Sequence, residues 1–206
     1  RLISGVGCNA TAMILALLPL ARAGLVRRAL ADVKVGSSEA GAESTDASHH
    51  PLRSRATRTY APTGHRHIAE VQQELGAGSG PIGLDATITS IDIVRGVLCT
   101  MHIEPTRPVD EREVRRHFRE AYEREPFVRI VAERSGLHRL PDPKVLVGSN
   151  FADVGFAVDP GSGRIVTLAA IDNLVKGAAG SAIQALNVAL GLEETAGLRA
   201  PGIFPA

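Results

Sequence analysis

Residues 87–104 alternate β-branched and polar side chains, and this alternation constrains the fold more than any other feature of the chain. A period of two is typical of strands, so we expect one long strand or two here. Shorter segments of strand character occupy residues 32–35, 127–132, 144–147, 154–158 and 164–171. The sequence Asp-Pro-Gly-Ser-Gly at 159–163 predicts a hairpin turn between the last two. Together these strands predict a mixed or antiparallel sheet.

Helical patterns accompany the strands. We expect helices over residues 10–31, broken near Pro19 or Gly24, over 65–75 and over 175–190. Asp110 and Glu113 form a capping box that opens another helix. Residues 36–64 show little periodicity and are expected to form a long loop. The order predicts an α+β fold in which helices cover the sheet.

Composition narrows the functional class. The 206 residues carry a formal net charge of +1, and aromatic residues make up only 3%, which argues against general nucleic-acid binding. Two cysteines without a Cys-x-x-Cys motif favour a reducing, cytoplasmic setting. The apolar run at 13–20 is too short to span a bilayer. The first residue is Arg rather than Met, so we expect the chain to begin inside a larger protein.

Cys8 is the sharpest candidate for chemistry. It follows Gly5 and Gly7 and precedes a predicted helix, where backbone N–H groups point outward. These groups and the helix dipole are expected to lower the thiol pKa and to bind the oxyanion of a tetrahedral adduct. The glycines at 177 and 180, in the last predicted helix, are expected to let another backbone approach closely. The alternative for Cys8 is a buried structural cysteine.

His65, Arg66 and His67 form a second candidate. Histidine titrates near neutral pH, as a general acid or base must, and arginine binds phosphate or carboxylate. The alternatives are a solvated helix start, or a zinc site formed with His49 and His50. No Cys-x-x-Cys or His-x-x-x-His spacing supports zinc, so we expect no metal.

Arginines cluster at positions 53, 55, 58 and 66. They form either an exposed charged loop or a docking surface for an anionic substrate or an acidic protein. Ser37 and Ser38, after a predicted strand, can donate hydrogen bonds to a phosphate.

These motifs occur in one order along the chain. They are Ser-Gly-Val-Gly-Cys-Asn-Ala-Thr-Ala at 4–12, Gly-Ser-Ser-Glu-Ala-Gly at 36–41, His-Arg-His-Ile-Ala-Glu-Val at 65–71, Arg-Gly-Val-Leu at 95–98 and Asp-Asn-Leu-Val-Lys-Gly-Ala-Ala-Gly at 172–180. The set resembles the N-acetyl-gamma-glutamyl-phosphate reductase family, a relative of aspartate-semialdehyde dehydrogenase. The resemblance covers essentially the whole chain. It implies the catalytic-domain fold of aspartate-semialdehyde dehydrogenase and glyceraldehyde-3-phosphate dehydrogenase-like enzymes.

Within that family, the chain is most similar to the branch that acts on substrates tethered to an amino-group carrier protein. Residues 7–11, 48–51 and 60–67 carry this similarity. The acetylglutamyl branch has Pro and an aromatic residue where this chain has Val6 and Asn9. The resemblance implies NADPH-dependent reduction of carrier-bound 2-aminoadipate 6-phosphate, or of glutamate 5-phosphate, through a cysteine thioester in lysine and arginine biosynthesis. It also implies an acidic carrier protein as partner and a homodimer or homotetramer.

By the same resemblance, Cys8 matches the family nucleophile, and either His65 or His67 matches the acid–base residue. Asn173 matches the region that meets the nicotinamide. Ser37, Ser38, Arg66 and Arg95 match substrate or phosphate contacts.

Nothing in the chain matches the Gly-rich loop of the family's NADP-binding Rossmann domain. We therefore expect residues 1–206 to be the catalytic, substrate-binding and dimerisation domain, with a helix at about 173–191 that packs on the missing domain. Two other functions stay open. One is the N-acetyl-gamma-glutamyl-phosphate reductase of arginine synthesis, and the other is a non-catalytic interaction domain.

Overall fold

The computed structural model describes residues 2–79 and 82–204. Its helices are α1 (Cys8–Arg22), α2 (His50–Arg53), α3 (His67–Ser79), α4 (Glu111–Tyr122) and α5 (Gly180–Ala189), with the short 3₁₀ turns η1 (Ser37–Ala40) and η2 (Pro143–Leu146) and the π turn η3 (Val175–Ala179). Its strands are β1 (Val26–Val35), β2 (Arg58–Ala61), β3 (Gly83–Ser90), β4 (Val97–Pro105), β5 (Val128–Ile130), β6 (Ala152–Val158) and β7 (Ile165–Ile171).

The seven strands form one mixed sheet in the order β2-β3-β1-β4-β7-β6-β5. β1 and β3 are parallel, as are β5 and β6, and the other neighbouring pairs are antiparallel. This confirms the predicted α+β class with a mixed sheet. The hairpin predicted at 159–163 is also present, because Gly163 N donates to Asp159 O (2.8 Å) between β6 and β7.

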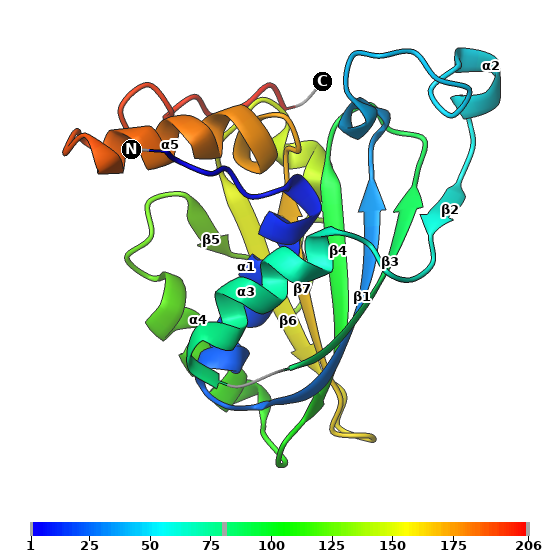
Figure 1. Ribbon diagram of the computed structural model, residues 1–206. Helices are drawn as coiled ribbons and strands as arrows, with labels where there is room; N and C mark the ends of the chain where they lie inside the picture. Colours follow the sequence, from blue (N-terminus) through cyan, green and yellow to red (C-terminus); the bar gives the residue numbers. More distant parts are fainter. Residues whose placement is uncertain (1, 80–81, 205–206) are drawn as a thin grey trace.

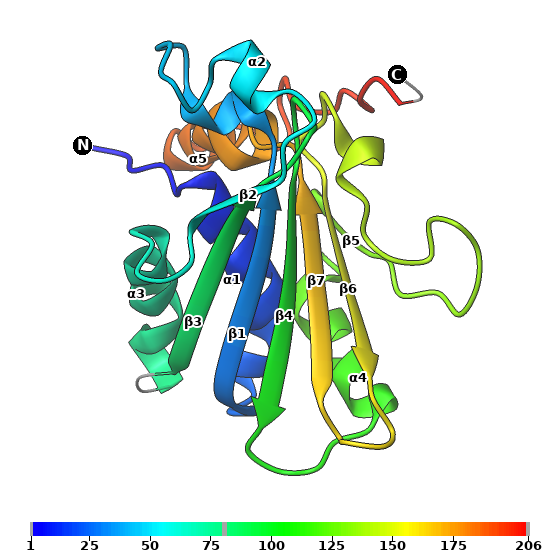
Figure 2. The ribbon, with the colours of Figure 1, turned by 90° about the vertical axis from the view of Figure 1, so that its right-hand side faces the viewer.

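Helices α1, α3 and α4 cover one face of the sheet, and α5 and α2 lie at one end of it (Figures 1 and 2). On β1 the alternation places Ala29, Ala31 and Val33 fully buried in the core, whereas Leu30 is 47% exposed. In Figure 2 the other face of the sheet is turned to the viewer, and no helix in the described part of the chain crosses it.

Helix α1 accommodates Pro19 without breaking. Proline has no N–H to donate, so the carbonyl of Leu15 loses its helical partner. The Tyr122 hydroxyl of α4 donates to that carbonyl instead (2.7 Å). The helix ends at Arg22, and Gly24, just after the C-cap residue Ala23, has a φ of +66° that only glycine adopts easily. The expected helix over 10–31 is therefore too long, because β1 begins at Val26 and not at Asp32.

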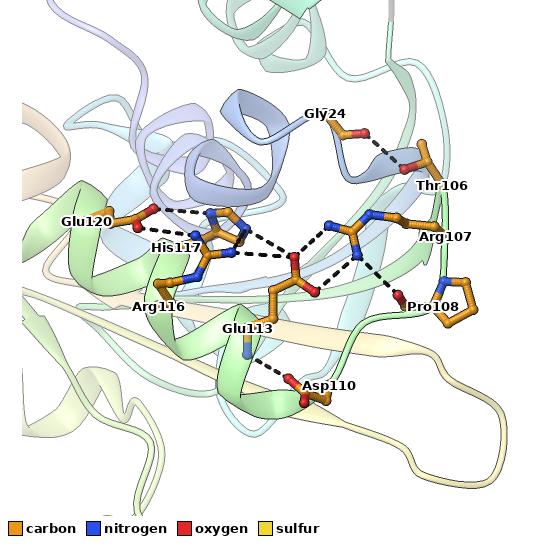
Figure 3. Close-up of polar contacts among 9 residues, drawn as sticks. All are labelled: Gly24, Thr106, Arg107, Pro108, Asp110, Glu113, Arg116, His117 and Glu120. Carbon is orange, nitrogen blue, oxygen red and sulfur yellow. Dashed lines mark hydrogen bonds and ion pairs between the residues drawn. The ribbon is translucent and has the colours of Figure 1, made fainter.

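Helix α4 begins at the predicted cap, where the Asp110 carboxylate accepts from Glu113 N (2.7 Å). Figure 3 shows that the Glu113 carboxylate pairs with Arg107 of the preceding loop (2.6 Å) and with Arg116 one turn later (3.5 Å). The same carboxylate lies 3.7 Å from His117. These pairs tie the β4–α4 connection to the helix it enters.

Of the remaining expectations, one strand is absent and the others are confirmed or refined. Residues 144–147 do not form a strand, because Asp142 caps the 3₁₀ turn η2, which Pro143 opens. The segment 87–104 contains parts of two strands, which is one of the two expected alternatives, and a turn with Gly96 at φ +129° separates them. The predicted loop 36–64 includes η1, α2 and β2, and α3 begins only at His67. The predicted C-terminal helix begins as a π turn and continues as α5. None of the helices in the described ranges is both long and apolar enough to cross a bilayer.

Candidate active site

Cys8 is the first residue of α1, and Gly7 is its N-cap. The thiol is partly buried, and it donates a long hydrogen bond to Asn9 Oδ1 (3.7 Å). A Cβ on Gly177 would lie 2.6 Å from Cys8 Cβ, so only glycine lets the turn η3 pack against the start of α1. This confirms that the glycines of 177–180 permit a close approach.

The pKa of Cys8 departs from the sequence-based expectation. Burial raises it to about 11, and the Glu39 carboxylate adds to the rise. Hydrogen bonding by the backbone of Asn9 and Cys8 lowers the pKa, as expected at a helix start, and so does Arg66. Desolvation outweighs these effects, so in this domain alone the sulfur is a thiol at neutral pH, not the expected thiolate.

His65 and His67 lie together beside the start of α1. Their ring centroids are 4.6 Å apart. A Cβ at position 7 would overlap the imidazole of His67, so this ring lies directly over Gly7. Burial lowers the pKa of both histidines, which leaves them neutral at pH 7 and able to accept a proton. His67 is the more enclosed, at 6% exposed.

Glu70, one turn after His67, is a site residue that the sequence analysis missed. Its carboxylate accepts from Gly7 N (2.8 Å) and lies 3.8 Å from His67 Nε2. It therefore holds both the chain before Cys8 and the imidazole beside it. The i, i+3 spacing to His67 was the available signal.

Glu39 and Tyr60 were also missed. Burial raises the pKa of Tyr60, and a hydrogen bond with Glu39 raises it further. The Tyr60 ring lies 6.2 Å from that of His65. Both missed residues line a cavity of about 250 Å³ together with Ser37, Ser48 and Arg58. The long segment 36–64 thus folds over the site rather than away from it.

Ser38, Arg95 and Asn173 are engaged within the chain. Asn173 Oδ1 accepts from Gly96 N (2.7 Å), and its Nδ2 donates to Ser38 Oγ (2.8 Å). Arg95 pairs with the fully buried Asp172 (2.6 Å). The structure brings these residues together, and the side-chain groups named above form bonds with other residues of the same chain.

Arg53 differs from the other arginines of the predicted cluster. Arg53 is 9% exposed and donates to Ile91 O (2.6 Å), so it holds the loop against the sheet. Arg58 donates to Leu52 O (2.9 Å) but is exposed, as are Arg55 and Arg66. No group of three metal-binding side chains occurs within residues 2–79 and 82–204.

A cavity of about 700 Å³ lies elsewhere. It opens beside the first residues of β1 and the last residues of β4, lined by Leu30, His102 and Arg164 among others. Cys8 begins α1 at the opposite end of the sheet, near α5 (Figure 1). This cavity is therefore separate from the candidate active site.

Comparison of the sequence with known proteins identifies relatives of this chain. Residues 8–173 match the family described as semialdehyde dehydrogenase, dimerisation domain. The LysW-L-2-aminoadipate 6-phosphate reductase of Deinococcus radiodurans is 49% identical over 97% of this chain and 57% of its own length. The LysW-L-2-aminoadipate/LysW-L-glutamate phosphate reductase of Saccharolobus solfataricus is 44% identical over 100% of this chain and 59% of its own. The chain thus spans less than two thirds of these relatives.

Solved structures share the fold. Aspartate semialdehyde dehydrogenase II from Vibrio cholerae superposes with a TM-score of 0.73 at 17% identity, covering 92% of this chain and 62% of that one. The aspartate semialdehyde dehydrogenase from Francisella tularensis gives 0.70 at 14% identity, covering 90% and 64%. Identities this low bear on the fold alone.

Proposed function

Because this chain belongs to the semialdehyde dehydrogenase dimerisation-domain family, we propose that it is the catalytic half of an NADPH-dependent reductase of a carrier-bound acyl phosphate. The substrate is 2-aminoadipate 6-phosphate, or glutamate 5-phosphate, attached to an amino-group carrier protein. The names of the relatives support this substrate class. The observation that carries the chemistry is the cysteine at a helix start with two neutral imidazoles beside it.

The Cys8 sulfur, once deprotonated, attacks the acyl carbon, and phosphate leaves to give a thioester. When bound, the nicotinamide cofactor supplies the hydride that reduces this thioester. The Cys8 sulfur is released as the aldehyde forms, and an imidazole removes or returns the proton. His67 is the better placed of the two for this role, because its ring lies over Gly7 and beside Glu70.

The Asn173 amide has a partner inside the chain at each end, and the residue is 3% exposed. We propose that it acts as a positioning residue that joins the turn at Gly96 to Ser38. The cofactor would be held by a Rossmann domain in the rest of the enzyme. Ser37, which lines the cavity beside Glu39, and the exposed Arg66 are the proposed substrate contacts.

Two uncovered apolar surfaces support a larger assembly. In and after α5, the side chains of Ile183, Leu186, Val188, Leu190 and Leu192 are 44–64% exposed. We propose that the missing domain packs there. The bare face of the sheet, which carries Leu30, is the proposed contact with a second copy, in keeping with the family's dimerisation role.

The test is Cys8→Ser in the complete enzyme, assayed with the carrier-bound and the acetylated phosphorylated substrates. We expect loss of all reductase activity, with Cys99→Ala as the control because Cys99 is buried in the sheet. Near-normal activity in Cys8→Ser would refute the mechanism. Activity on the acetylated substrate alone would refute the carrier-bound one, and an inactive complete enzyme would favour a non-catalytic domain.

We further propose that three exposed arginines of the segment 53–66, Arg55, Arg58 and Arg66, receive an acidic carrier protein. Salt weakens such contacts by screening. Carrier affinity should therefore fall with ionic strength, and an affinity indifferent to salt would contradict this docking mode.

A further inference from the structure

Arg53 is a buried arginine that has no acidic partner in the described part of the chain. It is 9% exposed, and its guanidinium donates to the carbonyl oxygens of Ile91 (2.6 Å) and Ala56 (3.5 Å). The buried aspartates of the described residues, Asp153 and Asp172, pair with other arginines. A charge removed from water is costly unless an opposite charge joins it. An anion beside Arg53 would therefore be favoured.

The cavity of about 250 Å³ described above has room for such an anion, and Arg53 lines it. An arginine carries five N–H donors, and the bonds to the two carbonyls do not use them all. Ser37, Ser48 and Ser90 also line the cavity, and a serine hydroxyl can donate to a carboxylate. Pockets for whole drug-sized molecules measure about 300–1,000 Å³, so this cavity fits one end of a small molecule.

The cavity extends to the surroundings of Cys8. Glu39 and Tyr60 line it together with Arg53. The Tyr60 hydroxyl donates to the Glu39 carboxylate and accepts from the side chain of Asn9, the residue that follows Cys8. The Glu39 charge also acts on the thiol, because it raises the pKa of Cys8. A ligand anchored at Arg53 would therefore extend past Tyr60 and Glu39 toward the sulfur.

We propose that the Arg53 cavity binds the α-carboxylate of the carrier-bound amino acid while the acyl phosphate of the same molecule lies at Cys8. The proposal rests on the proposed function, in which both candidate substrates carry these two groups at opposite ends of one carbon chain. Arg53 is the counter-ion of the carboxylate, and Ser37 and Ser90 donate to it.

The neighbouring acidic residue fits the same ligand. The amide N–H that links the amino acid to its carrier is attached to the carbon that bears the α-carboxylate. The Glu39 carboxylate, which lines the cavity, accepts from this N–H. An arginine and a glutamate in one small cavity thus select an N-acylated α-amino acid. Arg53 determines specificity in this scheme and does not touch the reacting atoms.

The test compares the binding of N-acetyl-L-norleucine and of its neutral α-carboxamide to the complete enzyme, measured by ligand-observed NMR. N-acetyl-L-norleucine has the carbon chain and the α-carboxylate of an N-acylated 2-aminoadipate but no second acid. We expect the carboxylate to bind at least about tenfold more tightly than the carboxamide, since hydrogen bonds to charged groups are the stronger ones. Arg53→Met should abolish this preference. Arg53→Lys keeps the charge and can still donate to Ile91 O, so it should retain the preference at weaker affinity.

The reductase assay supplies a second measurement. Arg53→Met should raise KM for the carrier-bound substrate at least about tenfold and change kcat little, because the contact is made equally before and during the reaction. Arg115→Met is the matched control. Arg115 also donates to a backbone carbonyl, that of Ala132 (2.9 Å), but it belongs to α4 and does not line the cavity. Its variant should match the parent in both assays.

Equal affinity of the parent enzyme for the carboxylate and the carboxamide overturns the proposal, as does an unchanged preference in Arg53→Met. The absence of any preference in a folded Arg53→Lys enzyme has the same meaning, so the proposal stays testable if Arg53→Met does not fold. Inorganic phosphate that binds more tightly than N-acetyl-L-norleucine, and depends on Arg53, would make the cavity a phosphate site and overturn the proposal too. The binding assays need no turnover, and Cys8→Ser in the complete enzyme decides the reductase assignment separately.

Discussion

The hydrogen bond from Tyr122 to the carbonyl of Leu15 should be worth more than an ordinary tyrosine contact, because it replaces the bond that Pro19 cannot make. The hydroxyl reaches across from α4 to the helix that carries Cys8 at its first position. Tyr122→Phe removes only the hydroxyl. The contact between the rings of Phe118 and residue 122, with centroids 6.1 Å apart, is retained.

The magnitude follows from what the carbonyl loses. A hydrogen bond contributes about 1 kcal/mol net, and a buried acceptor left without a partner costs about 1–3 kcal/mol. Tyr122 is 3% exposed, so water does not readily replace its hydroxyl. We therefore expect Tyr122→Phe to lower the free energy of unfolding by about 1.5 kcal/mol. For a domain of this size, the melting temperature should fall by about 3–6 °C.

Pro19→Ala provides the decisive comparison. Alanine restores an N–H at position 19, which can donate to Leu15 O within the helix. In that background, Tyr122→Phe should cost only about 0.5 kcal/mol, giving a coupling energy of about 1 kcal/mol in a double-mutant cycle. Urea unfolding of the four chains measures it. If Tyr122→Phe costs the same in the parent chain and in the Pro19→Ala variant, the idea that the tyrosine substitutes for the missing helical bond is wrong.

Three further outcomes are expected at the candidate active site. Because Glu39 raises the pKa of Cys8, Glu39→Gln should lower that pKa and speed alkylation of the thiol at about pH 8; an unchanged rate would show that the carboxylate does not act on the sulfur. Gly7→Ala forces a methyl group into the ring of His67 and should destabilise the chain by about 1–3 kcal/mol in thermal unfolding, whereas Gly5→Ala, with open space around it, should be neutral; equal effects would contradict the packing. Burial holds the pKa of His67 below its ordinary 6.5. Below that pH the unfolded chain therefore binds more protons than the folded chain does. As a result, the free energy of unfolding should fall as the pH drops from about 7 to about 5. His67→Gln should flatten this fall, and an identical pH dependence in the variant would count against a neutral buried imidazole.

Local sequence patterns predicted helix caps and turns well, because these depend on residues that are close together in the sequence. Asp110 caps α4 as expected, and the Asp-Pro-Gly-Ser-Gly turn joins β6 and β7. The first helix was expected to extend to residue 31 with a break near Pro19 or Gly24, because its apolar pattern runs on into β1. Apolar residues alone do not distinguish a buried helix from a buried strand.

The sequence likewise predicted only part of the candidate active site. Cys8 and the pair His65–His67 were recognised from short motifs, and the structure brings them together. Glu70 and Tyr60 were not recognised, because their importance lies in contacts with segments distant in the chain. Glu70 meets Gly7 across 63 positions, a relation that no local pattern encodes.

The sequence by itself determined which residues can do chemistry, since a sulfur, two imidazoles and a glycine-flanked helix start have properties that belong to the residues. Only the tertiary structure decided their protonation states and their freedom. Burial gives Cys8 a raised pKa where the helix start alone predicts a lowered one. Internal partners occupy both ends of the Asn173 amide. The reason is that solvation and hydrogen bonding depend on every group packed around an atom, and packing joins residues that the sequence keeps far apart.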